Sequence, residues 1–212
     1  MLSTTPRTSL GREKHRGSTD RNDLYEVLDS GLICHLGVLL NGHPMVIPTG
    51  YGRIGETLYL HGSTGAKSLR AGDGTEVCVT VTHLDGIVLA RSIFNHSINY
   101  RSAIIYGNAR LVVDEDERLA ALRALTEQLA PGQWDYARQP TRKELAKTAV
   151  LALSLEEASV KIRSGAPEDE PEDYDLPVWS GVLPLETRWG ALEADPKLAH
   201  DIAVPDHISH RR

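Results

Sequence analysis

Cysteine and long apolar runs are both scarce in this chain. Of its 212 residues, only Cys34 and Cys78 are cysteines, which is too few for a disulfide framework. We expect both thiols to behave as small buried hydrophobes in a reducing compartment. No apolar run approaches the roughly 18 residues that a membrane helix needs, and residues 1–20 lack the apolar core of an export signal. The sequence therefore predicts a cytoplasmic protein without a membrane segment.

A basic excess is also missing. The chain has 23 Lys and Arg residues against 29 Asp and Glu residues, a formal net charge of -6. Binding to nucleic acid without sequence preference depends on clustered positive charge. We therefore expect no nucleic-acid partner.

Several catalytic and metal-binding motifs are absent. The nine histidines include no His-Glu-x-x-His pair, and there is no Cys-x-x-Cys, so we expect no metal site. There is no Gly-x-Ser-x-Gly elbow of a serine hydrolase and no Gly-x-Gly-x-x-Gly of a Rossmann site. His200, His207 and His210 stand in a C-terminal segment without periodicity, where we expect them to be solvated.

Charge is distributed unevenly and indicates three parts. Residues 1–19 are polar and basic without periodicity, so we expect a flexible basic arm there. Residues 20–186 form the predicted folded domain, and residues 187–212 a loosely ordered tail. The acidic run over residues 168–175 is expected to be an exposed connector, because such runs are usually solvated. Docking of the basic arm onto this connector is the alternative.

Strand signals dominate the predicted domain. Asn41-Gly42 separates two apolar runs, which is a strong hairpin signal because both turn positions need positive φ. Residues 75–82 alternate between valines and other residues, and Asp85-Gly86 is interpreted as a turn before a strand over residues 87–91. Helices are expected in segments that begin at Asp20, Ser63, Asp114 and Pro140. At least seven strands with hairpin-length links predict a mainly β protein, an antiparallel barrel with a few helices.

The stretch from His61 to Ser68 combines groups that suit a phosphate. A strand ends at His61, glycine and hydroxyl residues follow, and Lys67 stands at the start of a helix. Free N–H groups, glycines, hydroxyls and one cation are the usual parts of a phosphate site. A P-loop needs Gly-x-x-x-x-Gly-Lys-Ser/Thr, and His61 and Ala66 replace its two glycines here, so we reject that interpretation. A plain strand–helix turn with a solvated lysine is the alternative.

Two further stretches are candidates for a binding site. Pro48 lies within a predicted strand, so this strand must run at an edge or beside a ligand. There Thr49 and the backbone near Gly50 can meet the polar rim of a flat heterocycle, whereas an edge strand with a bulge is the plain alternative. The polar cluster over residues 95–102 leads into a long strand and either lines a pocket or solvates a loop.

Taken in order, these stretches resemble the FMN-binding split barrels of the pyridoxamine 5'-phosphate oxidase-like superfamily. The most similar branch is that of flavin-nucleotide-binding proteins related to nitroimidazole-resistance reductases. The resemblance covers residues 12–186 and rests on Arg16-Gly17 with Asp20, residues 32–35, 46–49 with Tyr51, 58–63, Lys67-Ser68, 77–82, 99–102 with Gly107, and 177–184. It implies a six-stranded antiparallel FMN-binding split barrel that forms a homodimer with FMN at the subunit interface.

The resemblance also implies which residues bind FMN. One subunit is expected to hold the ring edge, the ribityl chain and the phosphate through Pro48, Thr49, His61, Ser63, Lys67 and Ser68. The other subunit is expected to close over the ring through Asn99, Arg101, Ser102 and Trp179. True pyridoxamine phosphate oxidases carry an Arg-x-x-Leu-Leu-Lys strand and a C-terminal Arg/His motif. Both are missing here, which argues against vitamin B6 oxidation.

The resemblance implies an FMN-dependent oxidoreductase. The flavin takes a hydride, with NAD(P)H as the expected donor, and passes electrons to a small acceptor such as a nitro compound or a quinone. His96 and Arg101 are the catalytic candidates for polarising this acceptor, with a solvated loop as the plain alternative for His96. Two other functions stay open, because fold alone does not choose among them. One is a protein that stores flavin nucleotide without turnover, and the other is a barrel that binds haem or a deazaflavin.

Overall fold

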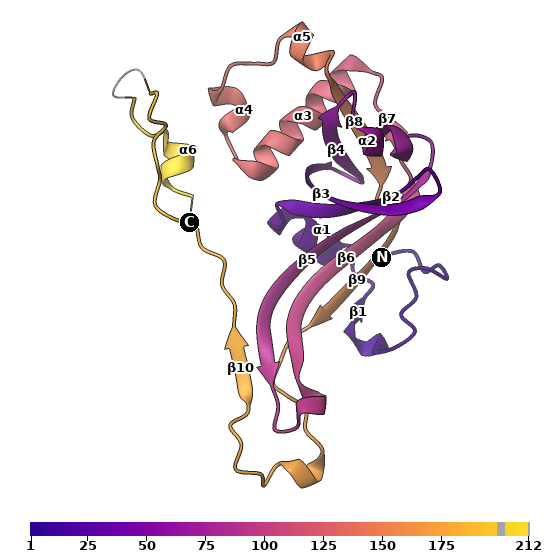
Figure 1. Ribbon diagram of the computed structural model, residues 1–212, viewed down its shortest axis with the longest axis vertical. Helices are drawn as coiled ribbons and strands as arrows, with labels where there is room; N and C mark the ends of the chain where they lie inside the picture. Colours follow the sequence, from indigo (N-terminus) through magenta and orange to yellow (C-terminus); the bar gives the residue numbers. More distant parts are fainter. Residues whose placement is uncertain (199–201, 212) are drawn as a thin grey trace.

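The computed structural model describes residues 1–198 and 202–211, and these form ten strands, six α-helices and three short 3-10 helices (Figure 1). The strands are β1 (Gly17–Ser18), β2 (Ile33–Leu40), β3 (His43–Ile54), β4 (Thr57–Ser63), β5 (Glu76–Leu89), β6 (Ser97–Asn108), β7 (Arg110–Leu111), β8 (Thr148–Ser154), β9 (Glu157–Arg163) and β10 (Gly181–Pro184). The helices are α1 (Arg21–Ser30), α2 (Lys67–Gly72), α3 (Glu115–Leu129), α4 (Gln133–Tyr136), α5 (Arg142–Leu145), α6 (Asp206–Ser209), η1 (Lys14–Arg16), η2 (Ile93–Asn95) and η3 (Pro171–Asp173). His200, which we expected to be solvated, lies outside the described residues.

The strands form one antiparallel sheet, in the order β1-β9-β6-β5-β2-β3-β4-β8-β7, with β10 added to β5. The mainly β, antiparallel architecture is confirmed, but the described residues form ten strands rather than six. Three of the additional strands are short: β1 and β7 span two residues each and β10 spans four. The fourth, β9, was not predicted, because its outward residues Glu157 and Lys161 make the segment polar. In the strand order, β6 stands near one end of the sheet and β7 at the other. Only Ala109 separates these two strands in the chain, so the two ends of the sheet lie close together and the sheet curls.

Strands β5 and β6 form a long ribbon that extends beyond the body of the molecule (Figure 1). The expected turn at Asp85-Gly86 is wrong, since the ladder shifts register between Leu84 and Gly86 and β5 continues to Leu89. Gly86 is needed there because β10 comes close: a Cβ on this residue would lie 2.9 Å from the carbonyl oxygen of Leu183. A glycine that permits a close approach thus resembled a turn signal.

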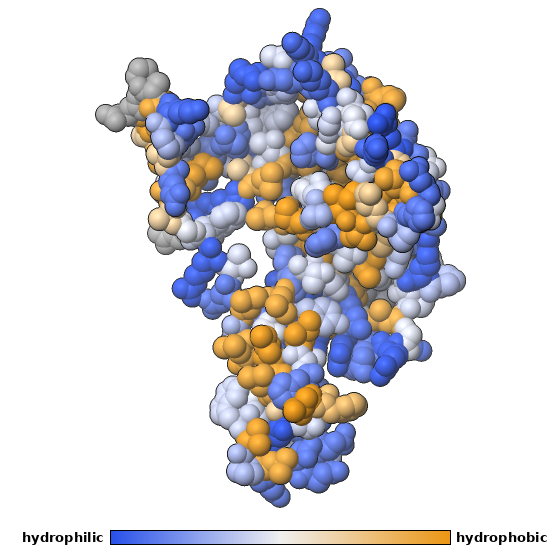
Figure 2. All heavy atoms as spheres, in the orientation of Figure 1, coloured by the Kyte–Doolittle hydropathy of each residue, from blue (hydrophilic) through white to orange (hydrophobic). Residues whose placement is uncertain are grey.

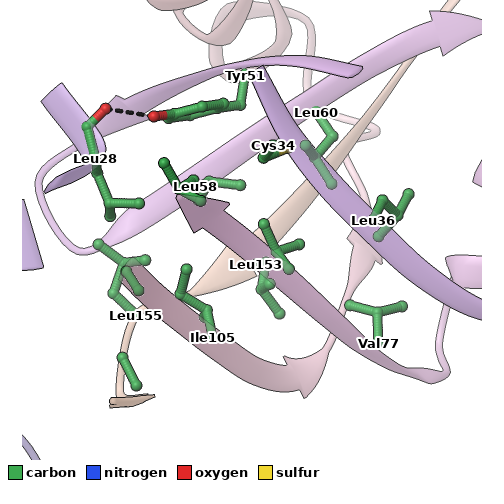
Figure 3. Packing of buried hydrophobic residues seen from close by; sticks show 14 of the residues in the cluster. Leu28, Cys34, Leu36, Tyr51, Leu58, Leu60, Val77, Ile105, Leu153 and Leu155 are labelled. Carbon is green, nitrogen blue, oxygen red and sulfur yellow. Dashed lines mark hydrogen bonds between the residues drawn. The ribbon is translucent and has the colours of Figure 1, made fainter. Parts of the chain in front are cut away.

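The main core lies inside the curled sheet and is closed by α1 (Figure 3). Alternate residues of the strands point into it, as the period of two requires. The Tyr51 ring is fully buried, and its hydroxyl donates a hydrogen bond to the carbonyl oxygen of Leu28, at the end of α1. Cys34 is buried in this core, as predicted, whereas Cys78 is half-buried on the opposite face of the sheet.

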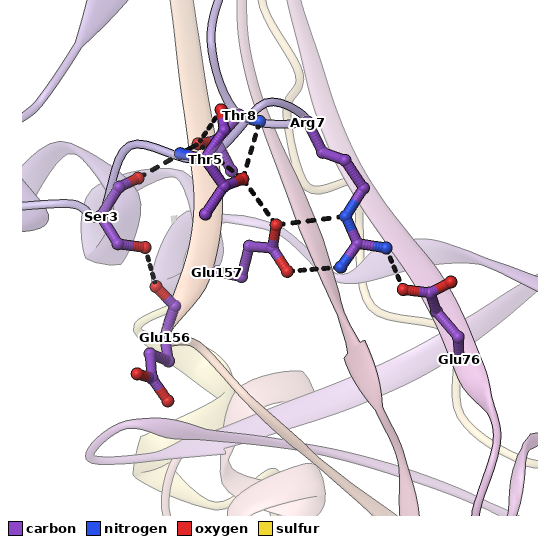
Figure 4. A network of polar contacts seen from close by, with 7 residues as sticks. All are labelled: Ser3, Thr5, Arg7, Thr8, Glu76, Glu156 and Glu157. Carbon is purple, nitrogen blue, oxygen red and sulfur yellow. Dashed lines mark hydrogen bonds and ion pairs between the residues drawn. The ribbon is translucent and has the colours of Figure 1, made fainter.

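The basic arm expected over residues 1–19 lies against the sheet. Its β1 pairs with β9, and the Leu2 side chain is buried. Arg7 forms ion pairs with Glu157 of β9 and Glu76 of β5, and its guanidinium lies 5.0 Å from the centroid of the Tyr106 ring (Figure 4). These contacts explain how a polar, aperiodic segment packs along a sheet without an apolar stripe of its own.

The acidic connector is anchored at one residue rather than fully exposed. The Asp169 side chain has no exposed surface, and it accepts hydrogen bonds from the backbone N–H groups of Arg91 and Ser92. The Arg91 guanidinium also lies 3.0 Å from this carboxylate. Burial acts to raise the pKa of Asp169, but these hydrogen bonds outweigh burial, and the pKa is lowered. The connector therefore docks on the tip of the ribbon rather than on the basic arm.

No helix among the described residues is long and apolar enough to cross a membrane.

Candidate functional site

Strands β3 and β4 separate partway along their length. Their ladder runs from Ile54 and Thr57 to Tyr51 and Leu60. Beyond that point, the ladders of the described residues pair β3 with β2 and β4 with β8. We call this place the split, with residues 43–50 on one side and His61–Ser63 on the other. Each side therefore has a free edge whose peptide groups are available to a ligand.

Pro48 and Thr49 stand on the free part of β3. This position confirms the expectation that a proline in mid-strand requires an edge. The Thr49 hydroxyl makes one hydrogen bond, to the carbonyl oxygen of the adjacent Gly50, at 3.3 Å. Thr49 is half-buried, and Pro48 is exposed on the outer face of the sheet.

The predicted phosphate-binding groups gather on the other side of the split. Ser63 ends β4, and Lys67 and Ser68 begin α2, whose N-cap residue Ala66 provides no side-chain cap. The Ser63 hydroxyl accepts one hydrogen bond, from the N–H of Gly65 at 3.2 Å. Among the described residues, Lys67 has no ion pair. One cation, two hydroxyls and uncapped N–H groups are therefore available to an anion.

His61 lies on the face of β4 that α3 covers. It lines a cavity of about 380 Å³ whose other walls include Leu122, Leu125, Leu129 and Trp134. Burial lowers the pKa of His61 below its ordinary value of 6.5. The imidazole is therefore neutral at pH 7, and can both donate and accept a hydrogen bond.

The three predicted residues of β6 are held by other parts of the chain. The Asn99 amide donates to the carbonyl oxygen of Gly165 at 3.1 Å. The Arg101 guanidinium contacts both carboxylate oxygens of Asp85, at 2.9 and 3.1 Å, and these hydrogen bonds raise its pKa. The Ser102 hydroxyl donates to the Lys161 carbonyl oxygen at 3.3 Å. The structure accounts for all three polar side chains without a ligand.

The segments beside η2 and β10, which carry His96 and Trp179, lie at the end of the ribbon, where β5 pairs with β6 and with β10 (Figure 1). The Trp179 side chain is 69% exposed and lies over Gly181, at the start of β10. His96 is exposed beside η2, and its Nδ1 lies 2.9 Å from the carbonyl oxygen of Ser92. The predicted residues therefore lie in three places: Pro48 and Thr49 on the free edge of β3, His61, Ser63, Lys67 and Ser68 at the end of β4 and the start of α2, and Asn99, Arg101, Ser102 and Trp179 on or beside the β5–β6 ribbon.

Sequence reasoning missed a second site, beside the C-terminal tail. Two cavities of about 590 and 510 Å³ share Ser30, Leu32 and Thr187 as lining residues. We call them together the tail groove. Figure 2 shows the tail standing beside the body, with an opening between them. The groove is also lined by His83, Arg101, Trp189, His207, His210 and Arg211.

The prediction of solvated histidines in the tail is wrong for His207. Its Nε2 lies 2.9 Å from Gln133 Oε1, and its ring centroid lies 5.3 Å from that of Tyr136. The sequence signal for this groove was a tail that contains Trp189 and two histidines three residues apart, His207 and His210. The groove itself was not predictable, because its walls come from segments that lie far apart in the chain.

The curled antiparallel sheet with its split defines a class, the split barrel of flavin-binding proteins. A family model described as pyridoxamine 5'-phosphate oxidase matches residues 20–162. The chain therefore belongs to the pyridoxamine 5'-phosphate oxidase-like family.

Solved structures extend this similarity over the whole chain. The flavocytochrome Anf3 from Azotobacter vinelandii is 36% identical, with a TM-score of 0.95 over 100% of this chain and 99% of that one. The FAD and haem binding protein from Mycobacterium smegmatis is 39% identical, with a TM-score of 0.88 over 92% of this chain and 97% of that one. A candidate 5-nitroimidazole antibiotic resistance protein from Bacteroides thetaiotaomicron shares the fold, at 20% identity and a TM-score of 0.58, over 69% of this chain and 86% of that one. A comparison with curated proteins gives no match.

Proposed function

We propose that this protein binds a flavin nucleotide at the split and uses it to pass electrons from NAD(P)H to an acceptor. One observation carries the proposal: each side of the split offers a free strand edge, and the hydroxyls of Thr49 and Ser63 and the ammonium of Lys67 make few or no contacts with the described residues. Bound flavin supplies hydride and electron transfer, and the protein binds and orients it. No acid–base side chain is required for that chemistry.

The residues at the split have distinct proposed roles. Lys67, Ser63 and Ser68 bind the phosphate, and the charge-assisted hydrogen bond from Lys67 is the strongest of these contacts. Pro48 and Thr49 contact the edge of the isoalloxazine ring, and the neutral His61 forms hydrogen bonds with the ribityl hydroxyls. FMN, which the sequence led us to expect, and FAD, which the M. smegmatis relative binds, both carry this phosphate. Mass spectrometry of the flavin released from purified protein distinguishes the two.

A second copy of the chain completes the proposed site. On the outer face of β2 and β3, Leu39 and Val46 are 64% and 66% exposed. Alternation along β2 and the pairing of Val46 with Gly37 place these side chains on one face. An apolar face of this kind is typical of an interface. We propose a homodimer, in which the partner subunit's ribbon brings Trp179 near the flavin.

Haem is the proposed second redox group. Two relatives that are 36% and 39% identical, and are matched over nearly the whole chain, are a flavocytochrome and an FAD and haem binding protein. The tail groove fits such a group, because cofactor sites measure roughly 300–1,000 Å³ and haem iron is commonly held by histidine. Haem would then receive electrons from the flavin within one protein. Pure storage of flavin is the competing function.

Lys67→Ala tests the phosphate site. Loss of a charge-assisted contact should lower flavin affinity by about 1.5–3 kcal/mol, which is roughly ten- to a hundredfold. Lys14→Ala is the matched control, because Lys14 is an exposed lysine on η1 in the N-terminal arm, whose β1 pairs with β9 rather than with β3 or β4. Riboflavin, which lacks the phosphate, should bind both variants equally. Wild-type FMN and FAD affinity in Lys67→Ala would rule out the phosphate role.

Anaerobic mixing with NADH or NADPH tests electron transfer. We expect the flavin absorbance of the loaded protein to bleach within minutes, and an acceptor to restore it faster than it restores free flavin. Flavin that stays oxidised with both donors would instead favour storage.

Light scattering tests the homodimer, which Val46→Asp should convert to monomer because it places a charge on the apolar face. A wild-type protein that is already monomeric contradicts the dimer.

A further inference from the structure

The tail groove combines apolar surface with imidazole, guanidinium and carboxylate groups. The carboxylates are those of Asp29 and Asp85, and Asp85 is paired with Arg101. Leu32, Ile33, Leu84, Leu185 and Trp189 contribute apolar surface. Arg211 lines the groove with its guanidinium 4.2 Å from the centroid of the Trp189 ring. Within the described part of the chain, Arg211 has no carboxylate partner. An arginine in this position suits a ligand carboxylate, such as a haem propionate.

His210 has one ring nitrogen fixed and the other free. Its Nδ1 lies 2.8 Å from the carbonyl oxygen of Asp206, one turn earlier in the chain. Because a carbonyl only accepts, Nδ1 carries the proton and Nε2 keeps its lone pair. Histidines that bind metals typically donate their other N–H to a backbone carbonyl in this way, which orients the ring and raises its basicity. The His210 side chain lines the groove, so Nε2 is the nitrogen available to iron.

The other two imidazoles of the groove are less suited. His83 uses Nε2, which lies 2.9 Å from the carbonyl oxygen of Val27, and keeps only Nδ1 free. Nδ1 is adjacent to the Cβ substituent of the ring, so a porphyrin on it would approach the strand that carries His83. His207 is held by Gln133 and Tyr136 and attaches the tail to α4. It therefore positions the segment that carries His210.

Two parts of the chain, the arm over residues 1–19 and the segment after residue 162, lie outside the family model but inside the match to the flavocytochrome. The family model ends at residue 162, before β10 and the tail. The two flavin-and-haem relatives are matched over 100% and 92% of the chain, so their match includes most of the residues after 162. A segment added to the flavin-binding family domain is a reasonable source of a ligand for a second cofactor.

We infer that haem binds in the tail groove with His210 Nε2 as an axial ligand of its iron. This inference rests on the proposed function, in which the chain carries a haem. Arg211 is assigned to a propionate, and His207 is a positioning residue that holds the tail in place.

Titration of haemin into the flavin-loaded protein, followed by absorbance, tests the assignment. We expect the wild-type protein to take up haem with a shifted Soret band. His210→Gly should bind haem at least tenfold more weakly, and added imidazole should restore the wild-type band by filling the vacated position. His15→Ala, which removes an exposed histidine on η1 in the N-terminal arm, should behave as wild type. Flavin binding should be unchanged in both variants, which shows that they are folded.

The contrary results separate the inference from the proposed function. If wild-type protein and His210→Gly bind haem with equal affinity and the same Soret band, His210 is not the ligand and haem binding itself stands. If the wild-type protein binds flavin but takes up no haem, then the haem part of the proposed function is wrong, and the axial assignment with it.

Discussion

Gly52 is the position at which α3 meets β3, and an added methyl group there has a predictable effect. A Cβ on Gly52 would lie 2.5 Å from the Leu125 nitrogen, 2.6 Å from the Ala124 carbonyl carbon and 2.8 Å from its oxygen. All three are backbone atoms, so no side-chain rotation relieves the overlap. For Gly52→Ala, α3 must move outward by roughly 0.9 Å, the difference between 2.5 Å and the 3.4 Å of an ordinary contact. We expect overpacking of this kind to destabilise the protein by about 3 kcal/mol.

Equilibrium unfolding in urea measures this effect. In a thermal unfolding experiment, the same loss of about 3 kcal/mol corresponds, for a chain of this length, to a fall in Tm of roughly 6–12 °C. Gly37→Ala is the matched control, because its Cβ would lie 3.4 Å from the Cys78 carbonyl oxygen and it too lies within a strand. We expect that variant to stay within about 0.5 kcal/mol of wild type. A Gly52→Ala protein as stable as the control would show that α3 does not pack on β3 as described.

Three other predictions concern charged groups. Asp169→Asn removes the charge that faces Arg91, so endoproteinase Glu-C, which cleaves after acidic residues, should cut within residues 168–175 faster than in wild type; an equal rate contradicts the anchor. Arg110 holds the pKa of Glu117 below its ordinary value, so the stability that this carboxylate contributes is present above pH 4.5 and lost as pH falls through its lowered pKa. Glu117→Gln should therefore reduce the difference in unfolding free energy between pH 7 and pH 3, and an unchanged difference refutes this. NMR titration of His61 should give a pKa below 6.5, because the cavity beneath α3 desolvates the imidazole; a higher value contradicts this desolvation.

Local patterns predicted most of the barrel because its strands are joined by short turns. Asn41 and Gly42 both have positive φ, as the hairpin signal required, and Asp114 accepts a hydrogen bond from the Glu117 N–H as the helix N-cap. The errors arise where distant segments meet. Gly86 looked like a turn residue because the chain that approaches it, β10, lies almost a hundred residues later in the sequence.

The two candidate sites differ in the same respect. The candidate flavin-binding residues of the split fall in two short stretches, 48–49 and 61–68. The sequence therefore indicated which groups they offer to a ligand, although it did not show how they are arranged in space. The tail groove combines residues 30–33, 82–85, 185–189 and 207–211, and no single stretch has a binding pattern. Similarly, Asp169 belongs to a run that composition predicts to be solvated, and only its contact with Arg91 shows otherwise.

The two proposed sites meet on one pair of strands, which bears on how they would work together. Ile33 lines the tail groove and pairs with Gly50, whose neighbour Thr49 stands at the split. At about 3.3 Å per residue, Pro48 lies only some 7 Å along β3 from Gly50. Flavins accept hydride from a nicotinamide, whereas haem carries out one-electron chemistry. A strand pair that holds both groups fixes the path between them, so electron exchange would depend on the fold of this chain rather than on the encounter of two proteins.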